Sequence, residues 1–317
     1  MINSQKSKWK FIIRLVGTIL SIILLIYLFY SVGFEELLSS VKSLSLGRIL
    51  LVIILIFISR IATFARWHVL LQIDTIKVSW KDSLRLTFAG LFAANFLPTT
   101  IGGDVVRLAG AMRLKVSGSL AAASLMVDRL IGMAGMAIVA PLGLLPLFAG
   151  LNQGTINNHL NYNHLPVLFI QKIFTKLKNL LQKIISSFDY WIHNPRILLS
   201  ALFFTFIHML CVFLIIEVLI IGMNESMPFW KIAGLWSLTY FITLIPVSIN
   251  GLGLQEVSFI NLFSIFGGIS DPTSFSIALI MRVLMLVGSV PGAFFISSIL
   301  SGEAYTEISR KNPLTLE

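Results

Sequence analysis

Long apolar runs separated by short basic segments dominate the chain. The first run, residues 15–32, follows a lysine-rich start, and the second, residues 49–65, is followed by a basic loop. A helix needs about 20 apolar residues to cross a hydrocarbon core of about 30 Å. Further long runs cover residues 120–151, 197–221, 229–247 and 275–300. The pattern predicts about six full transmembrane helices, with Pro141 and Pro146 bending or ending the longest of them.

Two segments interrupt this pattern with backbone breaks. Residues 86–97 would form only about 18 Å of helix, roughly half a crossing, before a segment that holds Pro98, Gly102 and Gly103. A second break, residues 246–253, follows the run 229–247. Such breaks survive at hydrocarbon depth only where they are buried in protein or line a wet cavity. The sequence therefore predicts two broken or re-entrant half-helices.

The middle of the chain is more polar. Residues 151–163 form an Asn-rich loop, and residues 165–188 carry lysines between apolar residues at helical spacing. This spacing predicts a basic amphipathic helix on an anionic membrane surface. Placing that helix on the cytoplasmic side requires one more crossing between residues 138 and 171 than the hydropathy supplies, so the topology stays open here.

Composition supports a membrane protein. Hydrophobic residues make up 56% and charged residues 12%, with a mean hydropathy of +0.90, whereas an average soluble domain has about 25% charged residues. The fold class is therefore an all-α polytopic membrane protein, a single domain over residues 1–317. The net charge of +10 lies beside apolar runs, which favours anionic lipid over nucleic acid. We expect a multi-pass protein of the cytoplasmic membrane with both termini in the cytoplasm.

Several chemistries have no motif in this sequence. Cys211 is the only cysteine, so no intrachain disulfide or cysteine-rich metal site is expected. The phosphate-binding motif G-x-x-x-x-G-K-[ST], the zinc motif H-E-x-x-H and a nucleophile elbow are absent. We expect no cofactor, and the pattern favours a transport protein over an enzyme.

The two breaks resemble each other. Residues 98–103 and 246–251 share a proline, a hydroxyl residue two positions later, an isoleucine and a glycine, and each break precedes a span that carries an arginine, Arg129 or Arg282. Interrupted helices at matching positions of internal repeats indicate a transporter site near the bilayer midplane. We therefore expect inverted repeat halves, residues 11–150 and 165–300, with the breaks facing each other.

Asp104 and Arg107 lie three residues apart, so they share a face of any helix that begins at Gly102 and can pair with each other there. Gly102 and Gly103 would let a ligand approach the backbone, and free amides at a helix start favour a lipid phosphate. The alternative is that Asp104 caps the helix while Arg107 extends to the interface.

Asp128 and Arg129 are adjacent, so on a helix they point about 100° apart and need different partners. A helix that begins at Ser119 would bury them about 14 Å deep, whereas one that begins at Leu130 would leave them at the surface. We expect burial, with Arg129 facing the cavity.

Glu256 follows the second break and could neutralise Arg129 or Arg282, or form a purely structural ion pair. Asn250, Gly251 and Gly253 make up that break, where ligand contact and glycine-only geometry are equally good explanations.

Other polar residues in apolar runs receive structural interpretations. Arg60 and Arg66 are expected to anchor the cytoplasmic end at lipid phosphates. His208 is expected to be a satisfied buried histidine and Glu217 an interfacial residue, although either could serve a proton relay.

Three motifs recur in an order typical of one family. Residues 95–107 read N-x-x-P-x-x-I-G-G-D-x-x-R, residues 128–132 read D-R-L-I-G, and residues 246–256 read P-V-S-I-N-G-L-G-L-Q-E. This series resembles the lysylphosphatidylglycerol synthase transmembrane region, also called the flippase-like family. Family members that make aminoacylated phosphatidylglycerol carry a C-terminal soluble transferase domain. The resemblance, without that domain, implies a stand-alone lipid translocation module.

The leading hypothesis is a flippase for an anionic or aminoacylated phospholipid or a lipid-linked glycan. A membrane-embedded transferase with Asp104 or Glu256 as general base is the first alternative, and a non-catalytic partner of a separate lipid-modifying enzyme is the second. The candidate substrate-binding residues are Gly102, Gly103, Asp104, Arg107, Asp128, Arg129, Asn250, Gly251, Gly253, Glu256 and Arg282.

Overall fold

The computed structural model describes residues 44–72, 78–95, 97, 102–152, 191, 193–245 and 251–301, and these residues form helices and no strands. Within these described ranges, four segments are long and apolar enough to cross a membrane: Leu46–Leu71, Gly118–Leu145, Pro195–Gly222 and Asp271–Ile296. The protein is thus a polytopic α-helical membrane protein, as predicted. The expected first span, the basic amphipathic helix, nearly all of the Asn-rich loop and the C-terminal tail lie outside the described residues.

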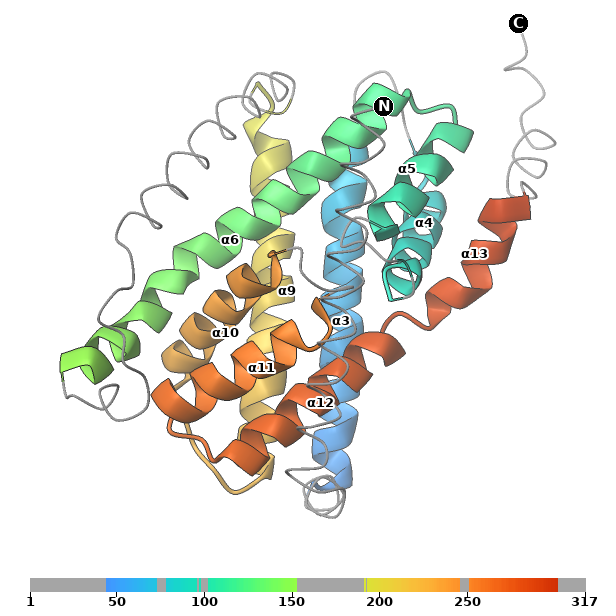
Figure 1. Cartoon of the computed structure of the whole chain (residues 1–317). Helices are drawn as coiled ribbons and strands as arrows, with labels where there is room; N and C mark the ends of the chain where they lie inside the picture. Colours follow the sequence, from blue (N-terminus) through green and yellow to red (C-terminus); the bar gives the residue numbers. More distant parts are fainter. Residues whose placement is uncertain are drawn as a thin grey trace, which may run out of the picture.

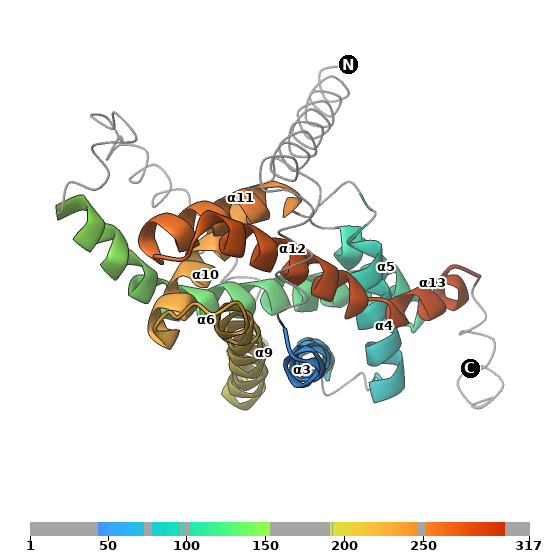
Figure 2. The same ribbon diagram turned by 90° about the horizontal axis from the view of Figure 1, so that it is seen from below.

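Helices α3 (Leu46–Leu71) and α9 (Pro195–Gly222) pack against each other as an antiparallel pair (Figure 1). Ser59 hydrogen-bonds His208 Nδ1 at 2.7 Å near the middle of the pair, and the indole nitrogen of Trp191 donates to the Leu70 carbonyl oxygen at 3.3 Å near one end. Seen from below, α4, α5 and α13 lie on one side of this pair, and α10 and α11 lie on the other (Figure 2).

Helix α6 (Gly118–Asn152) is the longest described helix, with 35 residues or about 52 Å. It continues through Pro141 and Pro146, so of the two expectations for these prolines, that they bend the helix or end it, the second is wrong. Figure 1 shows α6 crossing α3 and α9 obliquely, and tilt is the usual way in which a long helix fits a bilayer.

The helices beside the two breaks are short. Helices α4 (Trp80–Ala93) and α5 (Gly102–Arg113) flank the first break, and α10 (Phe229–Thr243) and α11 (Leu254–Asn261) flank the second. The chain continues from α11 into a π-helical turn, Leu262–Phe266. Helix α10 has only 15 residues, or about 22 Å, which is short of a hydrocarbon core of about 30 Å. Both breaks therefore follow a short helix.

The last apolar run is also divided. Helix α12 (Asp271–Val287) ends at Gly288, and α13 (Pro291–Ser301) begins after a short turn. Helix α13 packs against α4, where Gly292 lies against the Phe88 carbonyl. The span expected over residues 275–300 is therefore an apolar segment of membrane-spanning length, Asp271–Ile296, that a turn divides into two helices.

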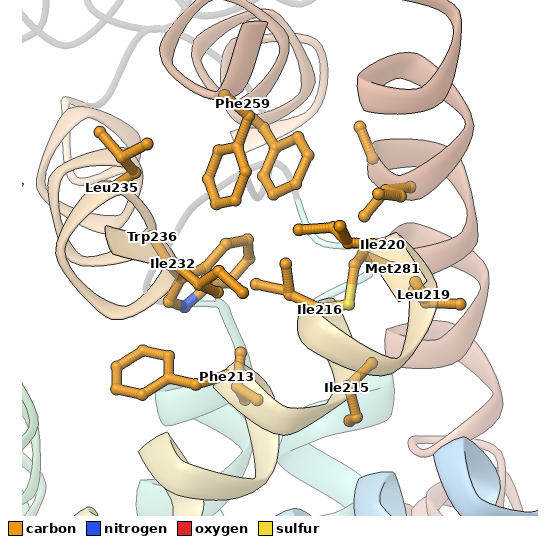
Figure 3. Packing of buried hydrophobic residues seen from close by; sticks show 14 of the residues in the cluster. Phe213, Ile215, Ile216, Leu219, Ile220, Ile232, Leu235, Trp236, Phe259 and Met281 are labelled. Carbon is orange, nitrogen blue, oxygen red and sulfur yellow. The ribbon is translucent and has the colours of Figure 1, made fainter. Parts of the chain in front are cut away.

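An apolar core joins α9, α10, α11 and α12 (Figure 3). Trp236 of α10 meets Phe259 of α11 edge to face with ring centroids 6.1 Å apart, and Phe259 stacks on Phe263 at 3.9 Å. Met281 of α12 and Ile216 of α9 complete this part of the core. Such packing fixes the positions of α11 and α12, which carry Glu256 and Arg282.

Gly234 of α10 and Gly143 of α6 meet at a helix crossing, where a Cβ on either residue would collide with the backbone of the other helix. Replacing Gly234 with valine should therefore separate the helices, and overpacking of this kind costs about 1–3 kcal/mol or more. We expect a lower melting temperature for the purified protein in detergent. Gly47→Ala is the control because nothing lies within 4 Å of a Cβ at Gly47. Equal melting temperatures for wild type and Gly234→Val would contradict the close crossing.

Candidate functional site

A cavity of about 350 Å³ lies between the two breaks. Gly103 and Asp104 of α5 line it on one side, and Gly251 and Gln255 line it on the other. Helices α3, α4, α6, α9, α10 and α12 complete the wall. The two breaks thus open onto one shared cavity.

The cavity wall is positively charged. Among the described residues, four arginines line it, Arg60, Arg107, Arg129 and Arg282, together with one carboxylate, Asp104. Uncharged polar groups contribute hydrogen-bonding capacity, namely Thr63, Thr87, Asn95, His208, Tyr240, Thr243 and Gln255. A site with this balance of charge favours an anionic ligand.

Asp128 is buried, with 2% of its surface exposed, and it joins three helices. Its Oδ1 accepts a hydrogen bond from Arg66 Nε of α3 at 2.6 Å, and its Oδ2 accepts two from Arg107 of α5 at 3.1 and 3.2 Å. The Arg107 guanidinium also lies 4.1 Å from the ring centroid of Trp67, a cation–π contact. Asp128 therefore lies behind the cavity wall and holds an arginine that forms part of it.

Asp104 accepts hydrogen bonds from two arginines. Its Oδ1 accepts from Arg107 at 3.2 Å, as expected for residues three apart on one helix, and its Oδ2 accepts from Arg129 Nε of α6. Arg129 lines the cavity, and its side chain is 41% exposed. Both carboxylate oxygens of Asp104 are thus engaged within the chain.

The first break brings α5 very close to α4. Gly102 and Gly103 are buried at the start of α5, and a Cβ on Gly103 would collide with the carbonyl oxygen of Gly90. Only glycine permits this approach, which places Asp104 at the cavity edge.

Glu256 organises the second break. It is 1% exposed, its Oε1 accepts from Arg282 Nε at 2.6 Å, and its Oε2 accepts from the Gly253 amide at 2.7 Å. Of its two expected partners, Glu256 pairs with Arg282. Gly251 and Gly253 adopt φ angles of 69° and 79°, a left-handed conformation that favours glycine. Asn250 lies outside the described residues.

The expectation that Arg60 and Arg66 anchor the cytoplasmic end at lipid phosphates is wrong. They are 8% and 9% exposed, and Arg60 lies about 21 Å along α3 from Leu46, near mid-helix. Neither side chain is a surface anchor. Arg60 and His208 both line the cavity. The sequence signal that could have placed Arg60 and His208 at the site is their position as isolated polar residues in apolar runs, because ionisable groups at such depth usually mark a functional site.

Comparison with known families agrees with this arrangement. The family model described as lysylphosphatidylglycerol synthase TM region matches residues 14–292, a range that includes both breaks and every arginine of the cavity wall. The chain belongs to this family. A comparison with curated proteins found no match. Membership of the lysylphosphatidylglycerol synthase TM family indicates a membrane-embedded protein with a lipid-related role.

Proposed function

We propose that the protein moves a lipid with an anionic head group between the two leaflets of the cytoplasmic membrane. The observation that carries this proposal is the cavity between the two breaks, whose wall holds four arginines and one carboxylate in the part of the chain that the structure describes. Its volume of about 350 Å³ lies in the range of small-ligand sites, about 300–1,000 Å³. This volume suits a head group, while acyl chains remain in the surrounding lipid.

The charged residues divide into two roles in this proposal. Arg107, Arg129 and Arg282 offset the charge of the head group, while Asp104, Asp128 and Glu256 hold those arginines in place. Gly103 and Gly251 bring the backbone at the two breaks to the cavity, and Gly102 and Gly253 are their neighbours in the chain. The lipid-facing spans and the polar cavity are the parts that a translocation path requires.

Matching geometry at the two breaks supports the repeat halves, residues 11–150 and 165–300. Asp104 is the third residue of α5 and Glu256 the third of α11, and each accepts a hydrogen bond from the Nε of an arginine on a later helix, Arg129 or Arg282. Movement of one half against the other would expose the cavity to each leaflet in turn. We further propose cytoplasmic termini and a separate lipid-modifying enzyme as the source of the substrate.

Purified protein in proteoliposomes tests this function. We expect labelled phosphatidylglycerol or its lysyl derivative to cross between leaflets faster than in protein-free liposomes of the same lipid composition. A labelled glycolipid without phosphate serves as the matched cargo control. Equal rates with and without protein across a broad panel of anionic lipids would contradict the translocase.

The transferase alternative has less support. Asp104 and Glu256, the candidate general bases, already accept hydrogen bonds from arginines, Asp104 on both of its carboxylate oxygens and Glu256 on one. The second oxygen of Glu256 accepts from the Gly253 amide, so neither carboxylate has an oxygen left free to accept a substrate proton. Turnover of a radiolabelled lipid-phosphate donor by purified protein would favour the transferase instead.

A further inference from the structure

Arg60 differs from the other arginines at or beside the cavity, a cluster formed by Arg60, Arg66, Arg107, Arg129 and Arg282. It is 8% exposed and lines the cavity. Its Nη2 lies 3.2 Å from the Met285 carbonyl oxygen and 2.8 Å from Met285 Sδ, while its buried Nε has no hydrogen-bond partner. Among the described residues, no carboxylate forms a salt bridge with Arg60.

The remaining arginines of the cluster all contact carboxylates. Arg66 and Arg107 contact Asp128, Arg107 and Arg129 contact Asp104, and Arg282 contacts Glu256. With Arg60, the described cluster holds five arginines and three carboxylates. A buried cation is strongly unfavourable without an opposite charge. An anion from outside the chain would supply that charge.

A structural role explains only part of this geometry. Met285 lies in the last turn of α12, where a cationic side chain favourably meets carbonyl oxygens. That contact uses one terminal nitrogen of Arg60. It explains neither the unpartnered Nε nor the position of the guanidinium in the wall of a polar cavity.

The surroundings of Arg60 suit a phosphate. Arg282 lies one turn before Met285 on α12 and lines the same cavity as Arg60. A guanidinium presents a planar set of donors that matches two phosphate oxygens, and two such groups form a strong anion site.

We propose that Arg60 binds the phosphate of the lipid head group and that Arg282 completes this anion site. The inference rests on the proposed translocase and narrows its substrates to lipids that carry a phosphate ester, rather than phosphate-free glycolipids. Arg60 thereby gains the counter-charge that the described chain does not provide.

Calorimetric titration of the full chain in maltoside detergent tests this site. The probes are short-chain phosphatidylglycerol and a phosphate-free glucosyl diacylglycerol with the same acyl chains. We expect Arg60→Met to weaken phosphatidylglycerol binding about 10- to 100-fold, the usual effect of losing a hydrogen bond to a charged group, without changing glycolipid binding. Arg60→Lys keeps the charge but loses the planar fork, so we expect a smaller loss. Arg196→Met, a charge removal at an exposed arginine, should bind as wild type does.

Wild-type phosphatidylglycerol affinity in Arg60→Met would overturn the assignment. If Arg60→Met does not fold, Arg60→Lys decides: equal losses for phospholipid and glycolipid would show a general change of the cavity and also overturn it. Inorganic phosphate and glycerol 1-phosphate separate the two sources of phosphate. Arg60-dependent binding of these compounds without preference for the lipid would support the anion site and contradict a lipid substrate. Arg60-dependent phosphatidylglycerol binding without transfer in proteoliposomes would overturn the translocase and leave the site standing.

Discussion

Replacing Asp128 with asparagine should severely destabilise the protein. Asp128 is 2% exposed and accepts hydrogen bonds from Arg66 and Arg107, which are themselves buried. Removing one partner from a buried ion pair typically costs about 3–5 kcal/mol, because the remaining charge is left uncompensated. Here two cations would lose a shared carboxylate, and α3, α5 and α6 would lose their common contact.

The apparent melting temperature and the yield of monodisperse protein in detergent measure this effect. Asp271→Asn removes a carboxylate at an exposed position, so it should change stability little. Adding Arg66→Met to Asp128→Asn should destabilise less than the sum of the single changes, because one stranded cation is removed as well. A wild-type melting temperature for Asp128→Asn would show that the ion pairs of Asp128 with Arg66 and Arg107 do not stabilise the fold.

Hydropathy predicted the long helices because a membrane span needs only length and apolar composition. The helices α3 and α9 and the shortness of α4 follow from that rule. Hydropathy failed where tertiary contacts decide the end of a helix. The sequence left open whether Pro141 and Pro146 bend or end their helix, and α6 continues through both, while the apolar residues 229–247 did not indicate that α10 stops at Thr243.

The charged residues also divide into contacts that local spacing predicted and contacts that only the tertiary structure shows. Spacing along one helix predicted that Asp104 pairs with Arg107. The bond between Asp128 and Arg66 joins residues 62 positions apart, and no local pattern indicates such a pair. Arg60 was misread for a related reason: its position in the run suggested a helix end, whereas the true α3 extends to Leu71 and places Arg60 near its middle.

Arg129 should matter for transfer far more than for folding. Its side chain lines the cavity and is 41% exposed, and partly exposed ion pairs contribute only about 0–1 kcal/mol to stability. Asp104 keeps Arg107 as a partner when Arg129 is removed. A charged hydrogen bond to a head group contributes about 1.5–3 kcal/mol. Arg129→Gln should therefore slow translocation about 10- to 100-fold while the melting temperature stays close to that of wild type.

Proteoliposome transfer of labelled phosphatidylglycerol, normalised to the amount of reconstituted protein, measures this loss. Arg113→Gln makes the same change at an exposed arginine of α5, so it controls for net charge and should transfer at the wild-type rate. The transfer rate of Arg129→Lys should lie between the rates of Arg129→Gln and Arg113→Gln, since lysine keeps the charge without the guanidinium fork. Full-rate transfer by Arg129→Gln would remove Arg129 from the path of the head group and leave it as a structural partner of Asp104.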